Sequence, residues 1–150
     1  MRPPSVNGPP SPRLVSERAY VERPTLDEFV SRLAAAASDM TIGDPTDPST
    51  ELGPLISHEH REKVLGYYQR AVDEGATVVI GGGVPDVGDH FSKGAWIQPT
   101  IWTGLADDAS VITDEIFGPC CHIRPFDSEE EVIQLANNTP YGLAATVWTS

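Results

Sequence analysis

Apolar residues recur with a helical period in two stretches of the chain and predict two helices. The first begins at Thr25, which forms a capping-box pattern with Glu28, and apolar positions 26, 29, 30 and 33 share one face. An alanine run continues this helix, which should end by Asp39. The second helix lies between Ser57, which can cap it, and Gly75, a natural stop. Its apolar stripe consists of Val64, Leu65, Tyr68, Ala71 and Val72.

A third helix is predicted near the end of the chain. Ser128 and Glu131 repeat the capping-box spacing, and acidic residues here favour the positive end of the helix dipole. Asn137 and Asn138 are typical of the end of this helix. Short apolar runs predict strands at 17–22, 76–80, 95–102 (interrupted by Pro99), 110–112, 120–126 and 144–148.

The order of these elements predicts the fold class. Strand 120–126, the third helix and strand 144–148 form a βαβ unit, and the whole chain alternates helices with strands. We therefore expect an α/β fold with a mostly parallel sheet and flanking helices over residues 16–150. The proline-rich residues 1–15 are expected to form a disordered arm. Because the last predicted strand ends just before the chain does, we expect the chain to be truncated.

Composition and charge narrow the function. The chain of 150 residues has 10 basic and 22 acidic residues, which gives a net charge of −12. Such an acidic surface repels phosphate backbones and anionic lipids, so we expect no nucleic acid and no membrane as partner. No apolar run approaches the roughly 20 residues that span a bilayer, and the N-terminus lacks the apolar region of a secretory signal. We expect a cytoplasmic protein.

The two cysteines, Cys120 and Cys121, are adjacent in a predicted strand. Their side chains should point to opposite faces, so a disulfide between them would be strained. We interpret them as reduced packing residues, since a nucleophilic thiolate would need a nearby base or a helix N-terminus. No spacing of cysteines and histidines resembles a metal site.

The stretch Glu115-Ile116-Phe117-Gly118-Pro119 combines a carboxylate, an aromatic ring and a Gly-Pro stop. Glu115 can accept hydrogen bonds from sugar hydroxyls, and Phe117 offers a surface for a ring. These residues taken alone also fit a loop in which Phe117 fills the core and Glu115 is solvated. The surrounding motifs favour the first interpretation.

These motifs together resemble the NAD-dependent aldehyde dehydrogenase superfamily over about residues 16–150. Within it, the likeness is closest to enzymes acting on amino- and hydroxymuconate semialdehydes in aromatic-ring degradation. The motifs are Glu115–Pro119, Pro125-Phe126, Glu129–Val132, Ala136–Ala145, Gly43-Asp44-Pro45, Gly53–Ser57, Glu74-Gly75-Ala76 with Gly82-Gly83, and Gly94-Ala95-Trp96 with Gln98-Pro99-Thr100.

The resemblance implies a reaction and a cofactor site. In the family, a cysteine thiolate attacks the aldehyde, hydride passes to NAD, and a glutamate-activated water releases the acid. Glu115 would bond the ribose hydroxyls on the nicotinamide side, and Phe117 would pack against the nicotinamide. Lys63 stands where the family often has a lysine near the adenosine ribose, and His60 lies one turn earlier. For Lys63 and His60, a solvated helix face is an equally good interpretation.

The chain departs from the family at its N-terminal side. Counting back from Glu17 brings the nucleophile's place to about Arg13, and no cysteine precedes Cys120. The glycine-rich dinucleotide turn and the general-base glutamate are also absent, so we expect no catalytic residue and no turnover from this chain alone. The alternatives are an enzyme component that works with a complementary half, a non-catalytic subunit that pairs with full-length relatives, and the product of a broken gene. A homo-oligomer is a further possible assembly. Cys120 or Cys121 as substituted nucleophile is the least favoured interpretation.

Overall fold

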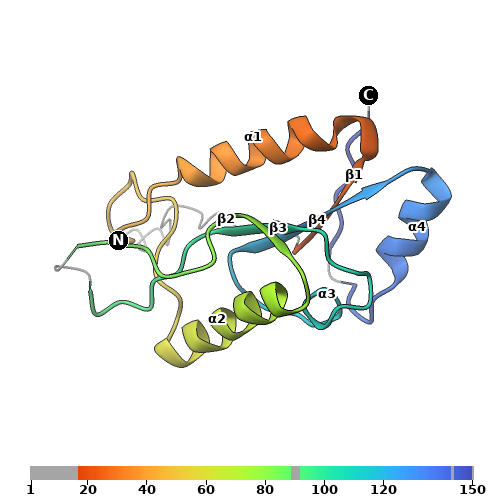
Figure 1. Ribbon diagram of the computed structural model, residues 1–150. Coiled ribbons are helices and arrows are strands. Elements are labelled where there is room, and N and C mark those ends of the chain that lie inside the picture. The colour runs from red at the N-terminus through yellow and green to blue at the C-terminus, as the bar shows by residue number, and fades with distance from the viewer. Residues whose placement is uncertain (1–16, 89–91, 143, 150) are drawn as a thin grey trace, which may run out of the picture.

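Four strands form one sheet in the computed structural model, which describes residues 17–88, 92–142 and 144–149. The strands are β1 (Arg18–Glu22), β2 (Thr77–Ile80), β3 (Thr100–Thr103) and β4 (Cys120–Phe126), in the order β1-β4-β3-β2. β4 pairs in parallel with both β1 and β3, whereas β2 runs antiparallel to β3 at the edge (Figure 1). The expected α/β fold with a mostly parallel sheet is confirmed.

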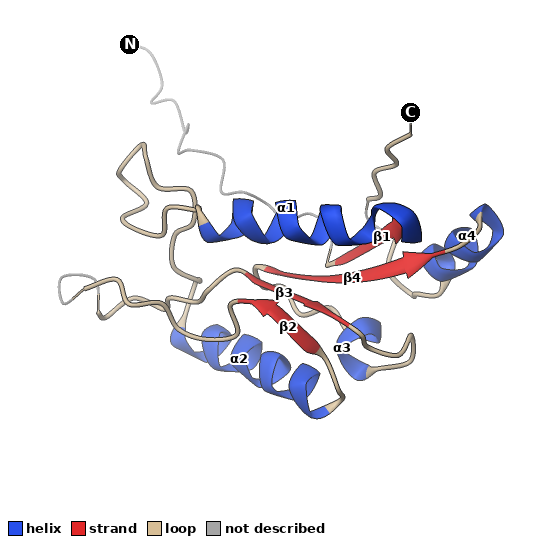
Figure 2. Ribbon diagram, turned by 45° about the horizontal axis from the view of Figure 1, so that its top comes forward, coloured by secondary structure: helices blue, strands red, loops and turns tan. Residues whose placement is uncertain are grey.

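Helices cover both faces of this sheet (Figure 2). The 13-residue α1 (Leu26–Ser38), entered through the short 3-10 helix η1 (Arg23–Thr25), lies along one face. The 16-residue α2 (His58–Asp73) and the short α3 (Ser110–Thr113) lie on the other. The helix α4 (Glu129–Asn137) follows the end of β4. None of the helices in the described ranges is long and apolar enough to cross a bilayer.

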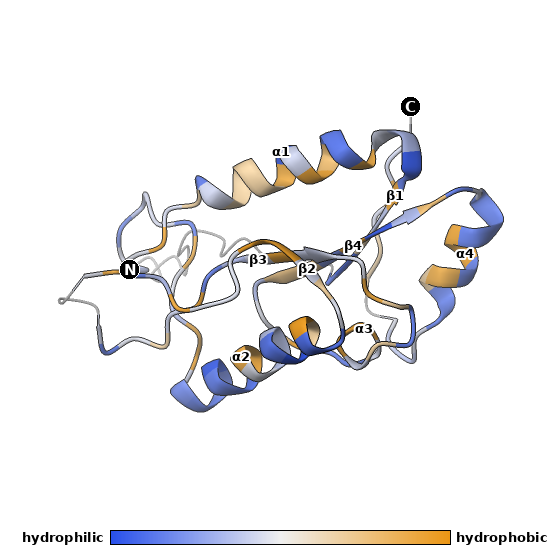
Figure 3. Ribbon diagram, viewed as in Figure 1, coloured by the Kyte–Doolittle hydropathy of each residue, from blue (hydrophilic) through white to orange (hydrophobic). Residues whose placement is uncertain are grey.

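The sheet separates two hydrophobic clusters, because neighbouring strand residues point to opposite faces. Cys120 belongs to the cluster on the α2 side, together with Val64 of α2, whereas Cys121 belongs to the cluster on the α1 side. The same alternation places Trp102 on the α2 side and Ile101 on the α1 side. Apolar segments of α1 and α2 face the sheet between them (Figure 3). The predicted opposite orientation of the two cysteines is thereby confirmed.

Two of the three predicted helix caps form as expected. The Ser57 hydroxyl accepts a hydrogen bond from the His60 N–H at 3.1 Å. The Ser128 hydroxyl accepts one from the Glu131 N–H at 3.2 Å, and the Glu131 carboxylate accepts one from the Asp127 N–H at 2.8 Å. The predicted capping box at Thr25 is wrong, because this residue lies in η1 and its hydroxyl donates back to the carbonyl oxygen of Glu22 at 3.0 Å.

Three predicted strands need correction. Residues 110–112 lie in α3, where the Thr113 N–H bonds the carbonyl of Ala109 and the strand-like apolar pair is one helical turn. β3 begins only at Thr100, because Pro99 has no N–H and the Gln98 N–H bonds the loop at Gly83 instead. Residues 144–148 form no strand, so the predicted βαβ unit lacks its second strand. The apolar side chains of this segment are not buried, since Val147 is 87% exposed and Trp148 90% exposed.

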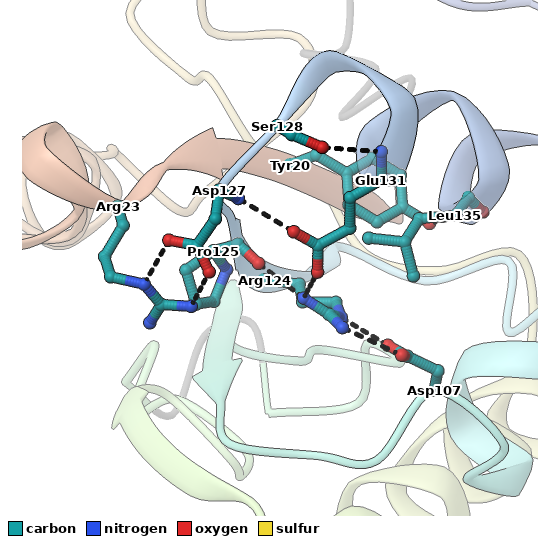
Figure 4. A network of polar contacts seen from close by, with 9 residues as sticks. All are labelled: Tyr20, Arg23, Asp107, Arg124, Pro125, Asp127, Ser128, Glu131 and Leu135. Atoms are coloured by element: carbon teal, nitrogen blue, oxygen red, sulfur yellow. Dashed lines mark hydrogen bonds and ion pairs between the residues drawn. The ribbon is translucent and has the colours of Figure 1, made fainter.

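A polar network fixes α4 and the loop before α3 to the end of β4 (Figure 4). The Arg124 guanidinium forms a two-point ion pair with Asp107 and a further ion pair with Glu131 at 3.2 Å. The Arg124 hydrogen bond holds the pKa of Asp107 below its usual range. At the next turn, Arg23 forms a second two-point ion pair with Asp127 at 2.6 Å. The expected disordered arm over 1–15 lies outside the described residues, so the domain division stays a prediction.

Candidate functional site

The loop between α3 and β4 carries the residues that the sequence singled out. Ile116 anchors it, with only 1% of its surface exposed, between the exposed residues Glu115 and Phe117. Gly118 then passes so close to α2 that an added Cβ would lie 2.7 Å from a methyl group of Val64. The loop is therefore packed tightly at its base while Glu115 and Phe117 remain accessible.

Phe117 does not fill the core, as it would in the alternative interpretation. Its residue surface is 70% exposed. Its backbone φ is +63°, which makes it the only non-glycine residue with a positive φ in the described part of the chain. A bulky residue in this left-handed region is strained, so surrounding contacts must hold it there.

His60 and Phe117 are in direct contact. The His60 Nε2 lies 2.8 Å from the carbonyl oxygen of Phe117, and the two ring centroids are 6.3 Å apart in an edge-on arrangement. The Ser57 cap fixes the first turn of α2 and thereby the backbone of His60. The structure therefore brings His60 to Phe117, and Glu115 lies two residues before Phe117 in the same loop.

Lys63 is the fourth predicted residue, and it lies one turn further along α2. It is exposed, and its Nζ lies 5.7 Å from the ring centroid of Tyr67. No hydrogen bond or ion pair in the described residues joins Lys63 to Glu115 or Phe117. Because residues three apart on a helix are neighbours, Lys63 lies on the same side of α2 as His60.

Glu17 is a site residue that sequence reasoning missed. Its carboxylate accepts hydrogen bonds from the backbone N–H of Ile116 at 3.0 Å and of Phe117 at 2.6 Å. These contacts span 99 and 100 residues of sequence, so no local pattern indicates them. The parallel pairing of β1 with β4 is the feature that brings Glu17 to this loop.

A family model for aldehyde dehydrogenases matches residues 14–150 of the chain. The chain belongs to the aldehyde dehydrogenase family. Among curated relatives, it is 68% identical over 136 residues to a 2-hydroxymuconic semialdehyde dehydrogenase from a Pseudomonas strain, covering 91% of this chain and 28% of that protein. It is 55% identical over 137 residues to a Pseudomonas 2-aminomuconic 6-semialdehyde dehydrogenase, with the same coverage of 91% and 28%. The chain therefore spans about 28% of the length of these relatives.

Solved structures of aldehyde dehydrogenases share the fold of this chain. The Mycobacterium tuberculosis aldehyde dehydrogenase complexed with NAD+ matches with a TM-score of 0.84 at 38% identity, covering 89% of this chain and 27% of that one. The NAD+ complex of the Bacillus cereus aldehyde dehydrogenase matches with a TM-score of 0.83 at 41% identity, covering 89% and 26%. The four strands and their helices are therefore part of the aldehyde dehydrogenase fold.

Both cysteines of the chain are packing residues. Cys120 is fully buried and Cys121 is 4% exposed. Burial, reinforced by the charge of Glu17, raises the pKa of the Cys121 thiol to about 12 and that of Cys120 further still. Both environments suppress the thiolate, which argues against a substituted nucleophile. The place near Arg13, where the family nucleophile is expected, lies outside the described residues.

No cluster of three or more histidine, cysteine, aspartate or glutamate side chains that could hold a metal ion occurs among the residues that the structure describes.

Proposed function

We propose that this chain is the part of a muconic semialdehyde dehydrogenase that holds the nicotinamide side of NAD. The observation that carries the proposal is the loop at Glu115 and Phe117, which is anchored at its base and exposed at its tip. The 68% identity to a 2-hydroxymuconic semialdehyde dehydrogenase supports the substrate class, an aldehyde that is oxidised to the acid. The buried free thiols and the acidic surface support a cytoplasmic location.

The residues of the site divide between the parts of the cofactor. Glu115 offers an exposed carboxylate to the ribose hydroxyls, and Phe117 offers an exposed ring to the nicotinamide. Lys63, which is exposed on α2, is assigned to the adenosine ribose because the family often has a lysine there. His60 is assigned to contact the cofactor through its ring and its Nδ1, because its Nε2 is already hydrogen-bonded to the carbonyl oxygen of Phe117.

The residues present fit this cofactor, because an exposed aromatic face beside a carboxylate suits a flat ring joined to a sugar. Bound there, NAD supplies the hydride acceptor for the oxidation. The chain's own residues bind and orient it. The attacking thiolate and the general base are expected from another part of the enzyme, because the described residues offer no suitably activated group.

The first test is binding of NAD+ to the isotope-labelled chain, followed by nuclear magnetic resonance. We expect the amide signals of Glu115, Phe117 and His60 to shift with increasing NAD+. Glu115→Gln and Phe117→Ala should weaken these shifts, whereas Glu130→Gln, an equal charge change on the exposed side of α4, should not. Shifts that spare this loop would contradict the proposal.

The second test asks for activity of a reconstituted enzyme. We would co-express the chain with the portion of a 2-hydroxymuconic semialdehyde dehydrogenase that precedes the matched region, and follow NADH formation with a muconic semialdehyde. Turnover that needs both partners and falls in the Glu115→Gln variant is the expected result. Stable co-purification without turnover would instead identify the chain as a non-catalytic interaction subunit.

A further inference from the structure

Phe117 combines a strained backbone with a ring that gains little from burial. Its φ of +63° is unfavourable for a residue that carries a Cβ. A core phenylalanine offsets such a cost by burying its ring, but this residue is 70% exposed. The contacts that hold the conformation must therefore be made by its backbone.

The first backbone contact is made by Glu17, on the N–H side. One carboxylate oxygen accepts the Ile116 N–H at 3.0 Å and the other accepts the Phe117 N–H at 2.6 Å. Both bonds are charge-assisted and are stronger than bonds between neutral groups. Glu17 is itself fixed, because its own carbonyl oxygen accepts a hydrogen bond from the His122 N–H of β4 at 2.8 Å.

The second contact is made by His60, on the carbonyl side. The Phe117 carbonyl can only accept, so the His60 Nε2 at 2.8 Å must carry the proton. The imidazole also meets the Phe117 ring edge-on, at an interplanar angle of 65°. The peptide groups on both sides of the Phe117 Cα are thus held by the side chain of Glu17, which directly precedes β1, and by that of His60 in α2.

We propose that Glu17 and His60 are positioning residues that lock Phe117 in its left-handed conformation, so that its ring forms a preformed platform for a planar cationic heteroaromatic ring. The π face of Phe117 attracts a positively charged ring. Two carboxylates add to this attraction: Glu115 lies two residues away in the loop, and Glu17 accepts the Phe117 N–H. Identifying that ring as the oxidised nicotinamide of NAD+ rests on the proposed function. Preformation lowers the ordering cost of binding, because the platform exists before the ligand arrives.

Amide hydrogen exchange tests the lock without any ligand. In Glu17→Ala, the Ile116 and Phe117 amides should exchange at least tenfold faster. Glu17→Gln should release these amides partly, because an amide offers one acceptor oxygen. Glu22→Ala, the same charge loss at the exposed end of β1, should leave both amides unchanged. The backbone bond from His122 to Glu17 survives every side-chain substitution, and unchanged exchange at β4 amides checks the fold.

The carbonyl side is tested by His60→Ala and His60→Gln. The alanine variant should broaden or shift the Phe117 ring signals, and the glutamine variant should restore them because its side-chain amide donates a hydrogen bond. Unchanged exchange of both loop amides in Glu17→Ala would overturn the proposal, as would unchanged ring signals in His60→Ala.

Saturation-transfer measurements with NAD+ connect the lock to binding. Transfer to the nicotinamide protons should fall severalfold in Glu17→Ala, while transfer to the adenine protons should persist. Faster exchange combined with undiminished nicotinamide transfer would overturn the positioning role. No nicotinamide transfer in the unaltered chain would count against the proposed function, and the exchange experiment would still decide whether Glu17 holds the loop.

Discussion

Trp102 and His122 lie opposite each other in the parallel pairing of β3 and β4, and each buries a ring nitrogen that has no hydrogen-bond partner among the described residues. They are 1% and 4% exposed. Burial, opposed by the charge of Asp107 and reinforced by that of Arg124, lowers the pKa of His122 to about 4. The folded chain therefore holds this imidazole neutral.

The depressed pKa of His122 makes the stability of the fold pH-dependent. An unfolded histidine has a pKa of about 6.5, so below that pH the unfolded chain binds a proton that the folded chain refuses until about pH 4. Stability is therefore complete above pH 6.5 and falls by about 3 kcal/mol as the pH drops to 4. Urea denaturation at pH values between 7 and 4.5 measures this loss.

His122→Leu is the matched control, because leucine is similar in size to histidine but has no group that titrates. Its stability should change less over the same pH range than that of the unaltered chain. The comparison stays above pH 4.5, since Asp107 and Asp127, whose pKa values are lowered by ion pairs, lose their contributions at more acidic pH. Equal slopes in the two proteins would show that His122 is not the titrating group.

At position 117, glycine should destabilise the fold less than alanine, which is the reverse of the order expected within a helix. Alanine keeps the Cβ that makes a φ of +63° costly, whereas glycine adopts this conformation freely. We expect Phe117→Gly to be more stable than Phe117→Ala by about 1 kcal/mol in chemical denaturation. At Val72, 48% exposed within α2, the order should invert, with alanine about 1 kcal/mol better than glycine. The same order at both positions would mean that Phe117 is not held in the left-handed region.

Gly118 is expected to be required for the contact between the loop and α2. In Gly118→Ala the new Cβ would lie 2.7 Å and 3.1 Å from the two methyl groups of Val64, which is fully buried and rigid. We expect a loss of about 1–3 kcal/mol from this overpacking. Gly66→Ala is the matched control, because nothing lies within 4 Å of its Cβ and the helix should gain about 1 kcal/mol.

A double-mutant cycle with Val64→Ala separates this clash from other causes. Val64→Ala alone leaves a cavity, but the alanine of Gly118→Ala would partly fill it. The double variant should therefore be more stable than the sum of the single effects by about 1 kcal/mol or more. Strict additivity would show that the two side chains do not meet.

Features set by neighbouring residues were predictable from sequence, and features set by distant ones were not. Ser57 and Ser128 cap helices through bonds three residues away, which a spacing pattern can detect. Thr25 shows the limit of such patterns, because the chain enters α1 through a 3-10 turn that diverts its hydroxyl.

The candidate site shows the same division. Glu115 and Phe117 were found from a local motif, and the structure leaves both accessible. The exposure and left-handed backbone of Phe117 could not be read from its identity, since most phenylalanines pack in cores. Glu17 could not be found at all, because its role depends on a strand pairing that joins positions 100 residues apart.

Cys120 and Cys121 should be inert until the chain unfolds. Reaction with a disulfide reagent requires the thiolate, and a pKa of about 12 leaves Cys121 on the order of a thousandfold less thiolate at pH 8 than a free thiol has. Cys120, whose thiol is fully buried, should react no faster. With 5,5′-dithiobis(2-nitrobenzoic acid), we expect slow labelling of the folded chain and rapid labelling of two thiols in urea. Rapid labelling of one thiol in the folded chain would show an available thiolate, and would restore the substituted nucleophile as a hypothesis.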